Sequence, residues 1–267
     1  MLNQYTRWLA VSAIFLIPTL SFAEGEVVQS VAHGQIHWSD GTITATGSGA
    51  PSLKAANVAV ARLGAERAAK MDAWRNILEA IKGARVQSGE TVDSMMSTSP
   101  QVKSRIEGIV RNFKIIDTKY YSDGGVDVIV QMPMSGVLLN TLLPDAGSKA
   151  VEGAAAASDV TGVVVNARGL GATPALAPRL LDEQGNVLFS AAHVSRNAAL
   201  QKGIAAYAKS LDKASKDERV AGNPSIIKAL KITEPGSPDL VLGPEDAAKV
   251  KALTSPLSQG KLVIVID

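Results

Sequence analysis

Residues 35–46 read Gln-Ile-His-Trp-Ser-Asp-Gly-Thr-Ile-Thr-Ala-Thr, and this stretch decides the fold of the first half of the chain. β-Forming residues alternate with polar ones on both sides of an Asp-Gly pair, which is the strongest short-range sign of a β-hairpin. Gly47-Ser48-Gly49-Ala50-Pro51 is expected to break the second strand. A second hairpin is predicted where the runs 113–121 and 126–132 flank an Asp-Gly-Gly turn. The two hairpins predict an antiparallel sheet.

A long helix is predicted between the hairpins, from about Ala55 to Lys82. Its apolar residues recur at spacings of three and four and form one stripe: Val60, Gly64, Ala68, Met71, Trp74, Leu78 and Ile81. The small residues of the stripe should let the helix approach the sheet closely, and Trp74 is expected in the core. Gly83 is placed to end the helix.

Two shorter helices complete the first half. Ser99 is a predicted N-cap with Pro100 at the first helical position, and this helix should run to about Asn112. A short apolar helix over 137–143 should end at Pro144. Residues 24–144 are therefore a predicted α+β domain.

Residues 145–159 are rich in Ala, Gly and Ser without periodicity, which predicts a linker. Residues 160–267 are a predicted second domain, with helices over 198–214 and 244–253. Strands are expected at 162–167, 226–232, 240–242 and 262–266, with a third hairpin over 179–189. The predicted fold class is α+β: two small domains, each with helices packed on one face of a mainly antiparallel sheet.

Residues 1–23 have the pattern of a secretory signal peptide. Arg7 precedes the apolar run 9–17, Pro18 breaks that run, and Ser21-Phe22-Ala23 precedes an expected cut ahead of Glu24. The alternative is a single membrane anchor, but the run falls short of the roughly 20 residues that span a bilayer. We therefore expect export to the periplasm, with a peripheral position at the outer membrane as a further option.

The composition excludes several classes of function. Lys and Arg total 27 against 25 for Asp and Glu, which is too even for a charge-driven nucleic-acid binder, so no nucleic-acid partner is expected. The chain has no cysteine. Thiolate metal sites, cysteine nucleophiles and lipid-modified cysteines are therefore ruled out.

No motif amounts to a catalytic signature. On a strand His33 and His37 would lie about 13 Å apart, with no further ligand expected nearby, so a metal pair is not predicted. Gly169-Leu170-Gly171 lacks the third glycine and the helix of a dinucleotide loop. The Ser-x-x-Lys pattern lacks its companion motifs at each of its three occurrences: Ser210/Lys213, Ser225/Lys228 and Ser258/Lys261. We predict no catalytic, cofactor-binding or metal-binding residue and no cofactor.

The first domain resembles a known family. The stretch from Ile36 to Gly49, the Ala-rich helix 61–81, the segment 106–110 and the hairpin at Asp123–Val128 follow the order of the LPP-twenty-like lipoprotein family. They are also similar to the N-terminal domain of the flagellar assembly protein T. The resemblance covers about residues 34–143 and implies an envelope protein without known catalysis. Family lipoproteins carry a cysteine after the signal; none is present here, so no covalent lipid anchor is expected.

These features predict a non-catalytic exported cell-envelope protein. Its expected role is an interaction or accessory component of an envelope or flagellar assembly, with envelope proteins as partners. One alternative is a periplasmic small-ligand binder that uses a cleft between the two domains. Another is an enzyme whose residues meet only in the fold, which one deep pocket with convergent polar side chains would favour.

Overall fold

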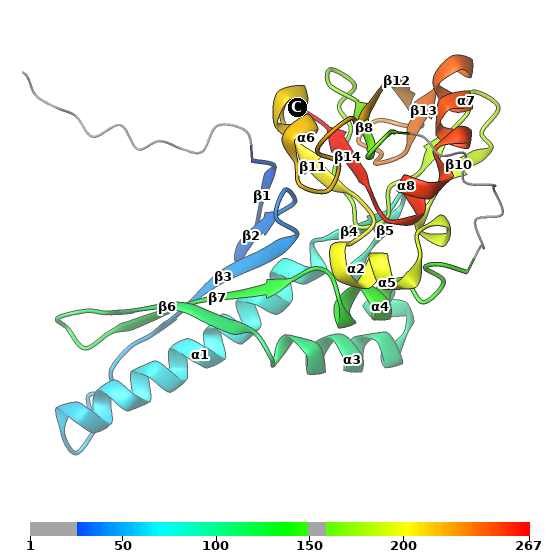
Figure 1. Cartoon of the computed structure of the whole chain (residues 1–267). Coiled ribbons are helices and arrows are strands. Elements are labelled where there is room, and N and C mark those ends of the chain that lie inside the picture. Colours follow the sequence, from blue (N-terminus) through cyan, green and yellow to red (C-terminus); the bar gives the residue numbers. More distant parts are fainter. Residues whose placement is uncertain (1–25, 149–158) are drawn as a thin grey trace, which may run out of the picture.

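The computed structural model describes residues 26–148 and 159–267, which build two large sheets, one two-stranded sheet and eight α-helices (Figure 1). The chain has the α+β fold that the sequence predicts. Within the described residues no helix is both long and apolar enough to cross a bilayer. Residues 1–23, predicted as a signal peptide, and most of the predicted linker 145–159 lie outside the described residues.

The first sheet is antiparallel and contains both predicted hairpins. Its strand order is β1-β2-β3-β7-β6, so β1 and β6 are the edge strands. The bounds are β1 Val28–Val31, β2 Gly34–His37, β3 Thr42–Gly49, β6 Lys114–Tyr120 and β7 Val126–Pro133. Gly41, with φ of +64°, makes the turn of the first hairpin, as expected for the Asp-Gly pair.

Helix α1 (Val58–Lys82) covers one face of this sheet and begins at Asn57, whose side chain accepts a hydrogen bond from the Val60 backbone N–H. The break expected at Gly47-Ser48-Gly49-Ala50-Pro51 comes later in that segment than its glycines, since β3 continues through Gly49, pairs with β7 along its full length and ends before Ala50 and Pro51. A Cβ atom on Gly47 would lie 2.0 Å from the Ala73 backbone nitrogen. The glycines therefore allow the helix backbone to approach the strand, which is why they belong inside the sheet.

The buried face of α1 differs from the predicted stripe over its first four turns. The buried residues are Ala65, Ala69, Ala73, Ile77, Leu78, Ala80 and Ile81, whereas Val60 and Met71 are exposed and Trp74 is only half-buried. The helix is rotated so that alanines face the glycines of β3, because larger side chains do not fit between backbones this close. The prediction that Trp74 lies in the core is therefore wrong, because its side chain packs against the core but is only half-buried.

Shorter elements cover the end of the first sheet. Ser99 caps α3 (Pro100–Val110) through the Val102 N–H, as predicted, and the apolar helix α4 (Val137–Leu142) follows β7. The connection between α1 and α3 contains a small hairpin and a helix: β4 Arg85–Gln87, β5 Glu90–Thr91 and α2 Val92–Thr98.

The second sheet has seven strands in the order β10-β9-β13-β12-β8-β14-β11. The third hairpin, between β9 and β10, is confirmed. The sheet as a whole is mixed rather than mainly antiparallel, because β8 pairs in parallel with both β12 and β14. The bounds are β8 Val163–Asn166, β9 Leu180–Leu181, β10 Val187–Phe189, β11 Ala206–Ala208, β12 Ser225–Ile232, β13 Leu240–Leu242 and β14 Leu262–Val265.

Both faces of the second sheet are covered, where helices were expected on one. Val164 faces a small cluster under α6, while Val163 and Val165 join the main core. The predicted helix 198–214 is wrong: it divides into α5, the parallel strand β11 and α6, because the apolar run at 204–208 fills the edge beside β14. The helices are α5 Arg196–Lys202, α6 Leu211–Lys216, α7 Pro244–Ala252 and α8 Thr254–Ser258, with a 3₁₀ turn at Ala191–His193.

The two halves share one hydrophobic core. Leu176 and Ala177 donate backbone hydrogen bonds to Arg85 and Val86 at 3.0 and 2.8 Å, which extends the β4 hairpin into the second half. Trp38 meets Tyr207 edge to face with ring centroids 5.8 Å apart. The division into domains at 145–159 stays a prediction. The first sheet is built from residues that precede this segment in the sequence, and the second from residues that follow it.

Candidate functional site

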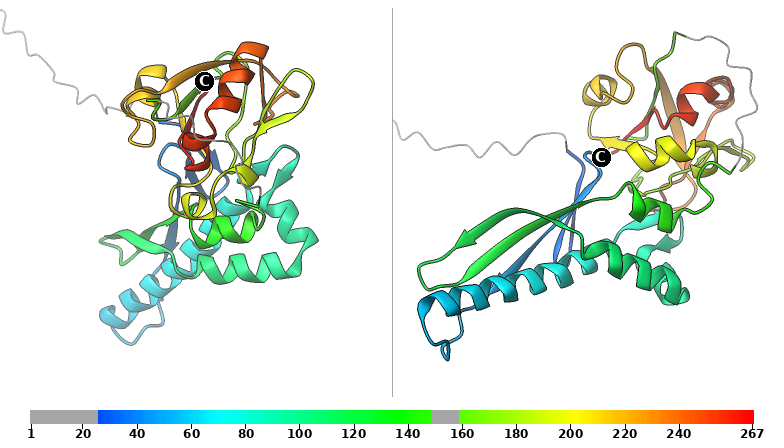
Figure 2. Two further views of the ribbon diagram at one scale, coloured as in Figure 1. Left: turned by 45° about the vertical axis from the view of Figure 1, so that its right-hand side comes forward. Right: turned by 60° about the horizontal axis from the view of Figure 1, so that its bottom comes forward.

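An arm projects from the first sheet. It consists of the first half of α1 (58–71) and the β6–β7 hairpin (114–133), which extend together away from the second half of the molecule (Figures 1 and 2). The arm carries exposed large apolar side chains; Leu63 and Met71 are each 55% exposed. The others are Val58, Val60, Ile115, Ile116, Tyr120 and Tyr121. Exposed apolar patches mark interaction sites in soluble proteins, so the arm is a candidate interaction surface.

Strand β6 makes the arm's outer edge. It is the last strand of the sheet and every residue except Thr118 is exposed. Arg62 of α1 lies over the Tyr120 ring, with the guanidinium carbon 5.6 Å from the ring centroid. An edge strand presents unpaired backbone groups to a partner unless charges or bulges blunt it. Here a bulge between Ile115 and Asp117 interrupts the pairing with β7.

At the tip of the arm, Asp127 of β7 accepts hydrogen bonds from the Tyr121 hydroxyl and the Ser48 hydroxyl, each at 2.7 Å. These hydrogen bonds stabilise the ionised carboxylate, so they lower the pKa of Asp127. The same carboxylate raises the pKa of the Tyr121 hydroxyl. The contacts tie the end of β3 to the hairpin turn.

A groove opens where α1 faces the connection between α3 and β6. It has a volume of about 640 Å³ and an apolar floor of Met71, Trp74 and Phe113. Three cationic side chains stand around it: Arg67, Lys70 and Arg111. The Arg111 guanidinium carbon lies 5.9 Å from the Trp74 ring centroid, within cation–π range. The half-buried Trp74, expected from its spacing to lie in the core, therefore lines a groove.

A second cavity, of about 460 Å³, lies between the two halves. Trp38, Asp40 and Met134 line it from the first half, and Lys202 and Glu218 are among the residues that line it from the second. Arg219 in its wall is held by the backbone carbonyls of Gly260 and Lys202. Burial lowers the pKa of Arg219. This cavity is where the predicted cleft between domains was expected.

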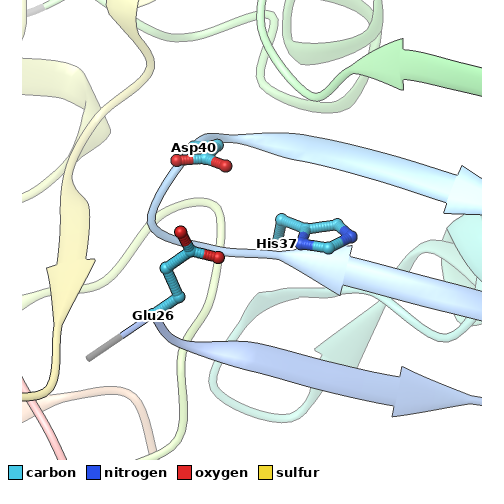
Figure 3. Close-up of side chains that lie close together, drawn as sticks. All are labelled: Glu26, His37 and Asp40. Carbon is cyan, nitrogen blue, oxygen red and sulfur yellow. The ribbon is translucent and has the colours of Figure 1, made fainter. Parts of the chain in front are cut away.

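Glu26, His37 and Asp40 lie together (Figure 3), and Asp40 also lines this cavity. One potential ligand atom from each residue lies within 4.8 Å of the others, and His37 Nε2 is 3.0 Å from the Thr44 hydroxyl. His33, for which no metal role with His37 was predicted, is not a member. Two carboxylates and an imidazole could hold a divalent cation. The sequence reasoning missed this cluster because it considered only the histidine pair, although Asp40 is three residues from His37.

The other patterns of the sequence have structural roles. The Ser210 hydroxyl caps α6 by accepting a hydrogen bond from the Lys213 N–H, and Ser258 donates to the Ser255 carbonyl. Asp182 accepts hydrogen bonds from Asn186 within the third hairpin turn, and these bonds lower its pKa. The Ser-x-x-Lys patterns at Ser210 and Ser258 are thus part of a cap and a turn, while Ser225 and Lys228 lie on strand β12.

Comparison with known proteins bears on the second half only. Residues 162–267 match the family model of Treponema pallidum Tp0624, second domain. The match spans the whole second sheet, from β8 to β14. No curated protein matches the chain. The resemblance of residues 34–143 to the LPP-twenty-like family stays a prediction.

Proposed function

We propose that this protein is a non-catalytic exported component of the cell envelope that acts as an interaction or accessory part of an envelope or flagellar assembly. The observation that carries the proposal is the exposed apolar surface of the arm, together with its groove. Soluble monomers rarely leave such a surface open, because covering apolar area is favourable by about 25 cal/mol per Å².

Two sequence features support the envelope location. The pattern of residues 1–23 predicts export. The resemblance of residues 34–143 implies an envelope or flagellar context. The proposed partner is another envelope protein, because an exported protein without a predicted lipid anchor can join an assembly at the membrane through a partner protein.

The test compares variants that keep secondary-structure propensity but remove apolar surface. Leu63→Gln changes the arm, and Ile226→Thr is the matched control, because Ile226 is 54% exposed on β12 of the second sheet. Gently solubilised envelopes are separated by sedimentation and the protein is detected by immunoblotting. We expect the wild type and Ile226→Thr in large assemblies and Leu63→Gln displaced toward the free protein. Identical profiles for all three would contradict the proposal.

A second function is supported by the cavity between the halves: binding of a small polar ligand. Its volume lies within the usual range of about 300–1,000 Å³ for ligand sites, and Trp38 offers an apolar wall beside the charged Lys202 and Glu218. The test is a thermal-shift screen of small periplasmic metabolites against the wild type and Lys202→Ala. A ligand that stabilises the wild type but not the variant supports this function.

A further inference from the structure

The groove of the arm combines an apolar floor with a cationic rim. Met71 and Trp74 come from α1, and Phe113 comes from the connection that leads into β6. Arg67 and Lys70 stand on α1, and Arg111 follows the end of α3. No carboxylate lines the groove. An occupant that neutralises the rim must bring negative charge as well as apolar surface.

Two of the three cations are free to meet that charge. Lys70 is paired with Glu66 at 2.7 Å, and this contact lowers the pKa of Glu66. Arg67 and Arg111 form no ion pair with a carboxylate anywhere in residues 26–148 and 159–267. Guanidinium groups favour carboxylates because two parallel N–H donors match the two oxygens.

Trp74 and Met71 provide a third requirement. Met71 is 55% exposed, and Trp74 is half-buried beside it in the floor of the groove. The indole Nε1 atom is closed off from solvent and has no hydrogen-bond partner among the described residues, so an occupant meets the apolar part of the side chain. An aliphatic or aromatic side chain of the occupant would cover this apolar surface.

We propose that this groove binds an acidic peptide segment of the partner protein, with one aliphatic or aromatic side chain inserted between Met71, Trp74 and Phe113. Carboxylates of the segment pair with Arg67 and Arg111, and the inserted side chain packs on Met71 and Trp74. This inference rests on the proposed function and names the chemistry of its partner. The volume of about 640 Å³ suits one or two inserted side chains of a short segment.

The probe is a short dye-labelled peptide with a Leu-Phe pair between runs of Asp and Glu. Two control peptides replace the Leu-Phe pair by Gly-Ser, or the acids by Lys. Binding to the purified protein is measured by fluorescence polarisation. We expect only the first peptide to bind well, and Arg67→Glu and Arg111→Glu each to weaken it about tenfold or more, the loss of one charge-assisted contact. Lys119→Glu, on β6 outside the groove, is the matched control and should weaken it far less.

Nuclear magnetic resonance gives a readout of the indole itself. The N–H signal of Trp74, assigned with Trp74→Phe, should shift on addition of the acidic peptide, while that of Trp38 stays in place. A peptide that binds without moving this signal, or equally to the arginine variants, would overturn the inference. Binding of anionic phospholipid vesicles in place of the peptide, lost in the same variants, would overturn it as well.

The two proposals fail separately. If Leu63→Gln releases the protein from its assembly but the groove variants leave peptide binding unchanged, the arm is an interaction surface and the groove is not its acidic-peptide site. If the sedimentation profiles are all identical, the proposed function itself fails.

Discussion

At the scale of single residues, two glycines decide how α1 packs. Gly47 and Gly49 face the backbone of the helix, and a Cβ on either would lie 2.0 Å from a backbone atom of α1. The face of α1 opposite these glycines buries a row of alanines. The close contact requires both the glycines of β3 and the alanines of α1, so neither set of residues predicts it alone.

We predict that Gly47→Ala destabilises the protein by about 1–3 kcal/mol, the usual cost of overpacking. The matched control is Gly64→Ala, on the solvent side of α1, where an added Cβ meets nothing within 4 Å. That change should stabilise the helix by about 0.5–1 kcal/mol, because alanine loses less entropy than glycine. Urea denaturation followed by circular dichroism measures both. Equal effects of the two substitutions would show that the close approach is not real.

Trp74 shows that apolar spacing alone does not predict which face of a helix is buried. The stripe 60-64-68-71-74 has a regular helical period, yet the helix buries the row that starts at Ala65. Periodicity identifies a possible face but not the shape of the surface opposite it. Only the glycines of β3 reveal that small side chains are required there, and the sequence reasoning treated those glycines as a strand break.

At the scale of elements, the local signals were reliable and the long-range ones were not. The hairpins at 35–46 and 113–132 and the capped helix at Pro100 form as predicted, because a turn or a cap is encoded within a few residues. Strand β11 was expected within a helix, because its parallel partner β14 lies more than fifty residues along the chain. The cluster of Glu26, His37 and Asp40 is an exception, since its members are close in sequence; it was missed because only the histidine pair was considered and the β1–β2 pairing beside Glu26 was not predicted.

The β6–β7 hairpin has a pH dependence that its hydrogen bonds predict. The folded pKa of Asp127 is lowered, so its contribution to stability is present above the unfolded value of about 3.9 and is lost as the pH falls through the folded value. We predict that Asp127→Asn and Tyr121→Phe destabilise the protein near neutral pH. Both differences from the wild type should fade as the pH falls below about 4.

The measurement is chemical denaturation of the wild type and both variants from neutral pH to about pH 3. The effect should be small, because the carboxylate is largely exposed and water screens its contacts. A difference between wild type and Asp127→Asn that grows on acidification would have the opposite sign and would contradict the assignment.

At the scale of the molecule, the two halves are joined by a shared core and by backbone hydrogen bonds. We predict that cutting a protease site inserted among residues 149–158 leaves two fragments that remain associated. Size-exclusion chromatography of the cut protein, followed by denaturing electrophoresis, tests this. Separation of the fragments under native conditions would show that the contacts between Trp38 and Tyr207, and between Arg85 and Leu176, do not hold the halves together.

The proposed function requires the arm to contact a partner protein in the cell. A photoreactive amino acid placed at Met71, in the groove, or at Ile226, equally exposed on the second sheet, tests this in living cells. After illumination and immunoblotting, we predict a discrete higher-mass adduct in the envelope fraction for position 71 and none for position 226. No adduct at position 71, or the same adducts at both positions, would contradict the claim that the arm is the interaction surface.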